Sequence, residues 1–315
     1  MIGYDDAVEA IRSLADPLES ESVELDEADA RVLAAPIVAG RASPPVTVSA
    51  MDGYAVRDAD LAATPVRLKV LGESFAGQGY VGSLEPGGCV RIFTGAPAPV
   101  GADRIVVQEV VCREGGVALM TERPTGARHI RAAASDFAAG DVLVNAGVML
   151  DPQKLVAAAA ADLSAVRVVR RPKLLVLSTG DELRAPGSNG VSVGGVPESV
   201  SFGVAALARR WGAQVEGRRR LPDDLERLEA AAAEALGACD LLVVTGGASV
   251  GDRDFAKPMF QRRGLELVFS KVAIKPGKPV WLGRADGTLV LGLPGNPTAA
   301  MVTARLFLAP LVAGL

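Results

Sequence analysis

The chain has 315 residues, of which 49% are hydrophobic and only 4% aromatic, and it carries a net charge of −4. This length allows one to three domains with a large core, whereas the charge and the scarcity of aromatic side chains argue against a nucleic-acid-binding protein. A single histidine, His129, and three widely spaced cysteines offer no basis for a histidine triad, a zinc site or a disulfide framework.

The N-terminal residues predict two helices and then a loop. Two aspartates near the start of the chain are suited to cap a helix that runs to about residue 15. Residues 25–35 are good helix formers and are stopped by a proline. In residues 42–60, a Pro-Pro pair enforces extended backbone and the Asp52-Gly53 pair favours a turn. We therefore expect a loop that presents Asp52.

Short β-rich pieces separated by Gly/Pro turns follow, and they predict a β-rich lobe at about residues 45–141. Two loops of this lobe are polar, at residues 94–97 and 128–136, and Asp136 ends the second of them. Asp52 and Asp136 are candidate functional residues, although each could equally belong to a surface turn. The Asp-Pro pair at 151–152 predicts the start of a further helix.

From residue 170 onward, strand and helix signals alternate. The chain is therefore expected to divide into an N-terminal region, 1–169, and a C-terminal domain, 170–315. The alternation predicts an α/β domain with a three-layer parallel sheet, preceded by an α+β region that carries the β-rich lobe. No signal peptide precedes the first residues, and no apolar run reaches the ~20 residues of a membrane span, so a cytoplasmic protein is expected.

Three expected strands of the C-terminal domain end in loops rich in glycine, hydroxyl and carboxylate groups. Parallel strands point the same way, so these loops should open at one edge of the sheet, called here the loop edge. Glycines let backbone amides approach a phosphate, and carboxylates suit Mg2+. Each loop alone is better interpreted as an ordinary turn, but the three together favour a ligand site. The candidates are Thr179, Gly180, Asp181, Glu182, Gly246, Gly247, Ser249, Gly251, Asp252, Asp254, Pro294, Gly295 and Asn296.

A basic loop adds positive charge to this half of the chain. Lys275 and Lys278 stand in a Lys-Pro-Gly-Lys-Pro sequence, whose prolines order the loop before it binds an anion. Lysine is a point charge suited to phosphate or another oxyanion. The alternative is a solvated basic turn.

Six motifs occur in the following order: SAMDGYAVRD, VRIFTGAPAPVGADRIVVQE, STGDEL, TGGASVGDRD, KPGKP and GLPGNP. Together they closely resemble the molybdopterin molybdenumtransferase family, the molybdate-insertion enzymes related to the gephyrin E domain. The resemblance implies a homodimeric enzyme of molybdenum cofactor biosynthesis. Such an enzyme uses adenylylated molybdopterin and molybdate, needs a divalent cation, usually Mg2+, and releases AMP.

The resemblance also implies roles for individual residues. Residues contributed by the second subunit would be Asp52, Thr94 and Asp136, and the catalytic set would be Asp52, Asp136, Glu182 and Asp254. The metal ligands would be Asp223, Asp224, Asp252 and Asp254. Lys275 and Lys278 would hold molybdate or phosphate, and the remaining loop-edge candidates would bind the molybdopterin substrate.

The sequence departs from the family pattern at several places. The family usually carries a further β-rich C-terminal domain, to which the resemblance does not extend. The Asp-Ser/Thr-Asn triplet of the family is replaced here by Glu198-Ser199-Val200, which lacks the amide. An alternative interpretation is therefore a non-catalytic paralogue that binds molybdopterin or a partner protein, and a third, weaker one is a general nucleotide-binding protein.

Overall fold

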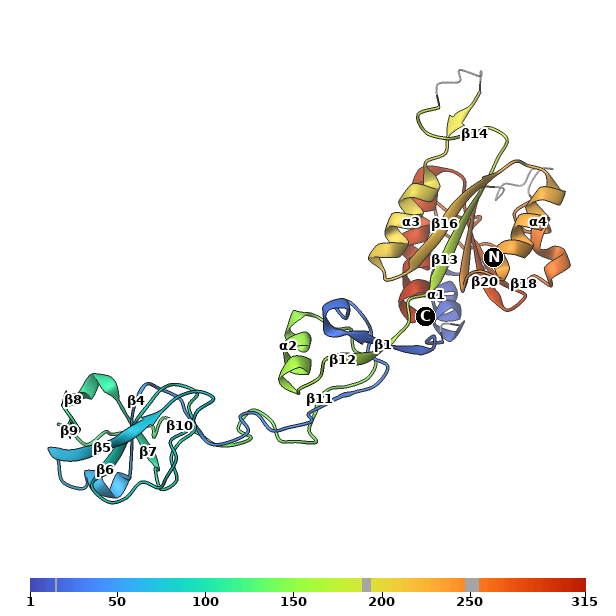
Figure 1. Cartoon of the computed structure of the whole chain (residues 1–315). Helices are drawn as coiled ribbons and strands as arrows, with labels where there is room; N and C mark the ends of the chain where they lie inside the picture. Colours follow the sequence, from blue (N-terminus) through green and yellow to red (C-terminus); the bar gives the residue numbers. More distant parts are fainter. Residues whose placement is uncertain (15, 189–193, 247–254) are drawn as a thin grey trace. The chain divides into compact units, whose positions relative to one another are not determined.

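A computed structural model gives the fold of the chain and describes residues 1–14, 16–188, 194–246 and 255–315. The described residues form two compact units (Figure 1). The first unit combines Met1–Glu21 with Val168–Leu315, and the second consists of Ser22–Arg167. The second unit is thus inserted into the sequence of the first. The boundary passes through β1 (Ser20–Glu24) and β12 (Ala165–Val169), which pair with each other.

Within the described residues, a six-stranded sheet forms the centre of the first unit. Its strands, in spatial order, are β16 (Gln214–Leu221), β13 (Lys173–Thr179), β17 (Leu241–Thr245), β20 (Thr288–Leu293), β19 (Trp281–Ala285) and β18 (Glu266–Phe269). The first four are parallel, as the sequence predicted, and β19 and β18 extend the sheet with an antiparallel edge. The turn Asp286-Gly287 causes the reversal between β19 and β20, because both residues have positive φ angles, 44° and 83°, which suit a two-residue hairpin.

Helices cover both faces of this sheet, which confirms the predicted α/β class (Figure 1). The helices of the first unit are α1 (Tyr4–Leu14), α3 (Val200–Arg210), α4 (Leu225–Leu236), the 3₁₀ helix Pro258–Arg263, and α5 (Pro297–Thr303), which continues through a π turn (Ala304–Leu308) into α6 (Ala309–Gly314). Successive side chains of β17 point to opposite faces: Val243 packs with α3 and the last helix, and Val244 packs with α4. A strand buried on both faces is the reason that its sequence is a continuous apolar run.

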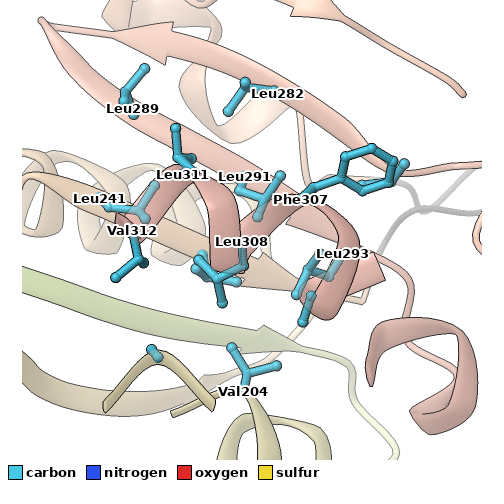
Figure 2. Packing of buried hydrophobic residues seen from close by; sticks show 14 of the residues in the cluster. Val204, Leu241, Leu282, Leu289, Leu291, Leu293, Phe307, Leu308, Leu311 and Val312 are labelled. Carbon is cyan, nitrogen blue, oxygen red and sulfur yellow. The ribbon is translucent and has the colours of Figure 1, made fainter. Parts of the chain in front are cut away.

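The helix Pro297–Gly314 is, within the described residues, the one segment long and apolar enough to cross a membrane. Half of that segment is buried inside the protein, and Phe307 and Leu308 have no exposed surface. Figure 2 shows these two side chains beside Leu291 and Leu293 of β20. The apolar character of this helix is therefore explained by its place in the core.

Helix α1 belongs to the first unit, although the sequence assigned residues 1–169 to one N-terminal region. Ala7 and Ile11 of α1 are buried in the same apolar cluster as Leu311. Ile2 forms a parallel β-bridge with Val272, in which its N–H donates to the Lys271 carbonyl and its own carbonyl accepts the N–H of Ala273. The apolar face of this short helix thus docks on a core built from residues far along the chain.

An ion pair ties the start of β13 to the start of β17. Two nitrogens of the Arg170 guanidinium donate to the Asp240 carboxylate at 2.6 and 2.8 Å, and the backbone N–H of Lys173 donates to the same carboxylate at 2.8 Å. The Arg170 hydrogen bonds lower the pKa of Asp240. The pair therefore stabilises the folded state most where Asp240 is ionised.

We expect Asp240→Asn to lower the free energy of unfolding at pH 7 by about 1.5–3 kcal/mol, the usual contribution of a hydrogen bond to a charged group. Because the pKa of Asp240 is lowered by folding, this contribution is present above its ordinary value of 3.8 and is lost as the pH falls through the folded-state pKa. The difference between the variant and the wild type should therefore shrink at pH 3. Urea titrations at pH 7 and pH 3 measure both values.

The matched control is Glu19→Gln, because Glu19 also accepts a hydrogen bond from Arg170, at 2.7 Å, but its side chain is 79% exposed. A pair exposed to solvent contributes little, so this variant should change the free energy of unfolding far less than Asp240→Asn does. Equal losses in the two variants would contradict the special role of Asp240.

The second unit contains a β-rich lobe. Its sheet, in spatial order within the described residues, consists of β7 (Arg104–Val107), β4 (Gly53–Val56), β6 (Gly88–Ile92), β5 (Val66–Ser74), β9 (Val117–Met120) and β8 (Val111–Glu114). Apolar clusters fill both faces, one around Tyr54 and Met120 and one around Ala55 and Ile92. The remaining elements of the unit are the 3₁₀ helices Leu25–Glu27, Asp58–Leu61 and Gln108–Val110, the short strands β2 (Ile37–Val38), β3 (Val48–Ser49), β10 (Ile130–Arg131) and β11 (Val142–Val144), and α2 (Pro152–Ala160).

The predicted helix at residues 25–35 is wrong. Only Leu25–Glu27 is helical, as a 3₁₀ turn, and Ala30 has a positive φ of 58°. The N–H groups of Ala30 and Leu33 instead donate to the carbonyls of Leu150 and Val148. Pairing with a distant segment has therefore overridden the local helix preference. The helix predicted after the Asp-Pro pair at 151–152 is confirmed as α2, whose first turn is capped by the Asp151 carboxylate.

Candidate functional site

The ends of three parallel strands meet at one edge of the first unit, as predicted. Ser178 of β13 pairs with Thr245 of β17, and Thr245 pairs with Leu293 of β20. The three strands therefore end at the same level, and the loops that follow them start side by side. This is the loop edge.

Gly246 lies between the other two loops. A Cβ at this position would lie 2.4 Å from the carbonyl oxygen of Thr179, and a Cβ at Gly295 would lie 3.4 Å from the Cα of Gly246. The φ angle of Gly246 is +96°, a conformation that residues with a side chain rarely adopt. Close packing of backbone and a left-handed conformation thus both require glycine here.

Carboxylates gather on one side of this edge. Asp181 accepts a hydrogen bond from the backbone N–H of Asp223 at 3.1 Å, so these two acidic residues are neighbours. The Glu182 carboxylate lies close to Gly180, because a Cβ built on Gly180 would lie 2.6 Å from Oε2 of Glu182. The side chains of Asp181 and Glu182 are exposed, and that of Asp223 is half-buried. The Asp224 carboxylate caps α4 by accepting the N–H of Arg227 at 2.9 Å.

The described residues include no group of three His, Cys, Asp or Glu side chains placed to hold a metal ion. Asp223 and Asp224 supply carboxylates next to the loop edge, of a kind that suits Mg2+. Five of the predicted site residues lie outside the described residues: Gly247, Ser249, Gly251, Asp252 and Asp254. Of the four metal ligands predicted from the sequence, only Asp223 and Asp224 thus lie within the described residues.

Asn296 caps the helix that starts at the loop edge. Its side-chain oxygen accepts the N–H of Ala299 at 3.1 Å, and Pro297 occupies the first helical position. This N-terminus is adjacent to Pro294 and Gly295 in sequence, so backbone donors of the helix open on the same edge.

We expect Asn296→Ala to lower the free energy of unfolding by about 1 kcal/mol, because the helix loses its cap. Asn296→Asp should keep most of this stability, since a carboxylate also caps well and suits the positive end of a helix. Thermal and urea unfolding of the three proteins test this order. A stability of the alanine variant equal to that of the wild type would show that the cap contributes nothing.

The basic loop also lies at this edge. β19 begins at Trp281, which pairs with Gly292 near the end of β20, so the residues that precede β19 emerge beside the end of β20. Gly277 has a φ of +105°, and a Cβ there would lie 2.2 Å from the Thr303 side chain. The loop is thus packed tightly on α5. Lys275 and Lys278 are exposed, and neither has an ion pair among the described residues.

In the second unit, Asp52 is fixed by Thr94. One oxygen of the Asp52 carboxylate accepts both the backbone N–H and the hydroxyl of Thr94, each at 2.8 Å. These two hydrogen bonds lower the pKa of Asp52. The next residue, Gly53, passes so close to the neighbouring strand that a Cβ would lie 2.1 Å from the carbonyl oxygen of Val106. Asp52 is thus a fixed, ionised carboxylate at the end of a buried strand.

Asp136 is held in a similar way by a different partner. Nη2 of Arg131 donates to both carboxylate oxygens, at 2.6 and 2.7 Å, and the Ser43 hydroxyl donates at 3.2 Å. The Arg131 contacts lower the pKa of Asp136. Both acidic candidates of the second unit therefore stay ionised well below neutral pH.

One segment connects the loops that carry these residues. Gly95 donates to the carbonyl of Ser49, Ala50 donates to His129, and Asp136 donates to Ser43. Residues 43–52 thus lie between the Thr94 loop and the Asp136 loop and hydrogen-bond to both. His129 contributes to this arrangement through its backbone carbonyl.

The sequence did not identify a buried acid near the loop edge. Glu198 is only 7% exposed and hydrogen-bonds to Ser178 and Ser201. Its position just before α3 was noted only as a departure from a motif. The helix-start signal in the sequence is Ser199, the N-cap of α3, and Glu198 precedes it by one residue.

Residues 2–161 match the family described as MoeA N-terminal region (domain I and II), and residues 175–314 match the probable molybdopterin binding domain. The molybdopterin molybdenumtransferase of Haemophilus influenzae is 37% identical over 300 residues, which cover 95% of this chain and 74% of that protein. The chain belongs to the molybdopterin molybdenumtransferase family. It therefore has a role in molybdenum cofactor biosynthesis, and its family members are transferases.

Further relatives agree with this assignment. The molybdopterin molybdenumtransferase of Bacillus subtilis is 34% identical, over 99% of this chain and 74% of that protein. The crystal structure of the molybdopterin biosynthesis MoeA protein from Pyrococcus horikosii has a TM-score of 0.86 and 30% identity, and the match covers 99% of this chain and 79% of that one. The chain thus spans about three quarters of the length of these relatives.

Proposed function

We propose that the chain inserts molybdate into adenylylated molybdopterin and releases AMP. The observation that carries this proposal is the convergence at the loop edge. Gly246 packs between the Thr179 and Gly295 loops, carboxylates lie on one side, and the lysine loop emerges beside the end of β20. Exposed backbone and mixed charges at the ends of parallel strands are typical of a site for a phosphorylated ligand.

The charges at this edge suit the proposed reaction. Cleavage of a phosphoanhydride next to molybdate brings several negative charges together. The ammonium groups of Lys275 and Lys278, exposed on a tightly packed loop, would bind and orient the oxyanions as charge develops. Mg2+, when bound, would neutralise phosphate charge. We propose that Asp223 and Asp224 contribute to holding it, together with Asp252 and Asp254.

The proposal includes a homodimer and a cytoplasmic location. In it, Asp52, Thr94 and Asp136 of one subunit serve the loop edge of the other. Support comes from the motifs that carry these residues and from their hydrogen bonds, which keep both carboxylates ionised and fixed. Fixed acids of this kind suit the orientation of a substrate or a cation.

The test supplies purified protein with adenylylated molybdopterin, molybdate and Mg2+, and measures AMP release and molybdenum in the product. The expected result is one AMP released for each molybdenum inserted. Omission of molybdate or of Mg2+ serves as the control for each requirement. Absence of AMP release from correctly folded protein would overturn the proposal.

A second candidate function, a non-catalytic molybdopterin-binding protein, is favoured by one observation. Val200 occupies the position of the amide in the family triplet, and it is 8% exposed and packs in the core. The chain therefore uses this position for apolar packing at the start of α3. Tight binding of the substrate without any AMP release would support this second function.

A further inference from the structure

A chain of buried hydrogen bonds connects two strands of the loop edge to helix α3. The Thr245 hydroxyl donates to the Ser178 hydroxyl at 2.9 Å, and the Ser178 hydroxyl donates to Oε1 of Glu198 at 3.3 Å. These three residues are 3%, 1% and 7% exposed. Buried polar groups are costly unless they are paired, so a chain of this kind holds its members in fixed positions.

The two hydroxyl residues stand directly before the loops. Ser178 precedes Thr179 and Gly180, and Thr245 precedes Gly246, whose backbone packs against Thr179. The register of β13 and β17 at this point therefore sets the position of Thr179–Gly180 relative to Gly246. A shift of one hydroxyl would move loop backbone that already lies in tight contact.

Glu198 ends this series of hydrogen bonds and is itself held in place. Besides Ser178, its carboxylate accepts the backbone N–H of Ser201 at 2.8 Å and the Ser201 hydroxyl at 2.6 Å, within the first turn of α3. Arg218 donates to the Ser201 hydroxyl at 3.3 Å and lies 3.6 Å from the centre of the Phe202 ring. The buried carboxylate thus has hydrogen-bond donors from two elements and a cation close to it.

We propose that Thr245, Ser178 and Glu198 are positioning residues, which hold the backbone of Thr179–Gly180 and of Gly246 in the arrangement that binds the molybdopterin substrate. The proposal rests on the proposed function for the identity of the substrate. The hydrogen bonds that join Thr245, Ser178 and Glu198, called here the lock, are present without any ligand. None of the three side chains is proposed to touch the reacting atoms.

A simpler role for Glu198 would be to cap α3. That role explains the two hydrogen bonds from Ser201 but does not explain the Ser178–Thr245 link. Thr245→Val, which breaks only this link, therefore distinguishes the two roles, and Ser178→Ala breaks it together with the hydrogen bond from Ser178 to Glu198.

The experiment compares four variants of the full chain. Thr245→Val removes the hydroxyl and keeps the shape, whereas Thr245→Ser keeps the hydroxyl. Ser178→Ala breaks the same link from its other side. The matched control is Thr288→Val, because Thr288 is a buried threonine at the opposite end of the same sheet, where its hydroxyl donates to the Leu236 carbonyl at 2.8 Å.

The first measurement is hydrogen–deuterium exchange without ligand at the amides of Gly180 and Leu183, whose N–H groups donate to Leu221 and Gly180. Thr245→Val and Ser178→Ala should speed exchange by about tenfold or more, while Thr245→Ser and Thr288→Val should leave it unchanged. The second measurement is steady-state AMP release. KM for adenylylated molybdopterin should rise about tenfold or more in the same two variants, with a smaller change in kcat.

The outcomes are separable. If wild-type protein releases no AMP, the proposed function fails, and exchange at Gly180 and Leu183 still decides the lock. If Thr245→Val and Ser178→Ala behave as Thr288→Val does in both measurements, the lock is overturned. If Thr245→Val does not fold, Ser178→Ala carries the same test.

Discussion

Gly246→Ala is expected to lower kcat/KM for AMP release by about 100-fold or more, because displacement of a binding loop by about 1 Å has an effect of this size. The new Cβ would lie 2.4 Å from the Thr179 carbonyl oxygen, which is a backbone atom and cannot rotate away. The loops must therefore separate. The positive φ of Gly246 adds strain, so the free energy of unfolding should also fall by about 1–3 kcal/mol.

Gly212→Ala is the matched control for this prediction. Gly212 has a φ of +104°, close to that of Gly246, but a Cβ there would meet no atom within 4 Å. It should therefore lose stability through backbone strain alone and keep its kcat/KM. Steady-state kinetics and urea unfolding separate the two effects. Equal kcat/KM values for the two variants would show that the contact between the loops does not matter for activity.

The second large effect is expected at the basic loop. Replacing both Lys275 and Lys278 with glutamine should weaken molybdate binding by about 100-fold or more, since each charged hydrogen bond contributes about 1.5–3 kcal/mol. Both side chains are exposed and have no ion pair within the described residues, so stability should be almost unchanged. Isothermal titration with molybdate, in the presence of the bound pterin substrate, measures the affinity.

Salt gives an independent check of this prediction. Binding by two ammonium groups should weaken as ionic strength rises, and the double variant should lose most of this dependence. Lys173→Gln is the control, because Lys173 is an exposed lysine at the start of β13, at the opposite end of the sheet. Unchanged molybdate affinity in the double variant would remove the two lysines from the site.

Much of the first unit could be predicted from the sequence because its signals are local. The continuous apolar run of β17 is typical of a strand buried on both faces, and glycine and proline mark the loops that follow β17 and β20. The parallel direction of these strands was then enough to place Gly246 and Gly295 at one edge. The Asp286-Gly287 pair between two apolar runs is typical of a two-residue hairpin and accounts for the antiparallel edge.

Other features depend on contacts between distant residues. The segment 25–35 has good helix formers, yet its backbone pairs with residues near 150, which no local pattern reveals. Likewise, Glu198, Ser178 and Thr245 are separated in sequence, and only the fold brings their side chains together. Short-range preference predicts elements well, but it does not predict which polar side chains will share a buried position.

The docking of α1 has a consequence for how the protein reaches its native state during synthesis. Ala7 and Ile11 are synthesised long before Leu311, which belongs to the core that covers them. The inserted unit, by contrast, is continuous in sequence and can fold as soon as it emerges. We therefore expect the nascent chain to hold an undocked, amphipathic α1 until the residues around Leu311 have emerged.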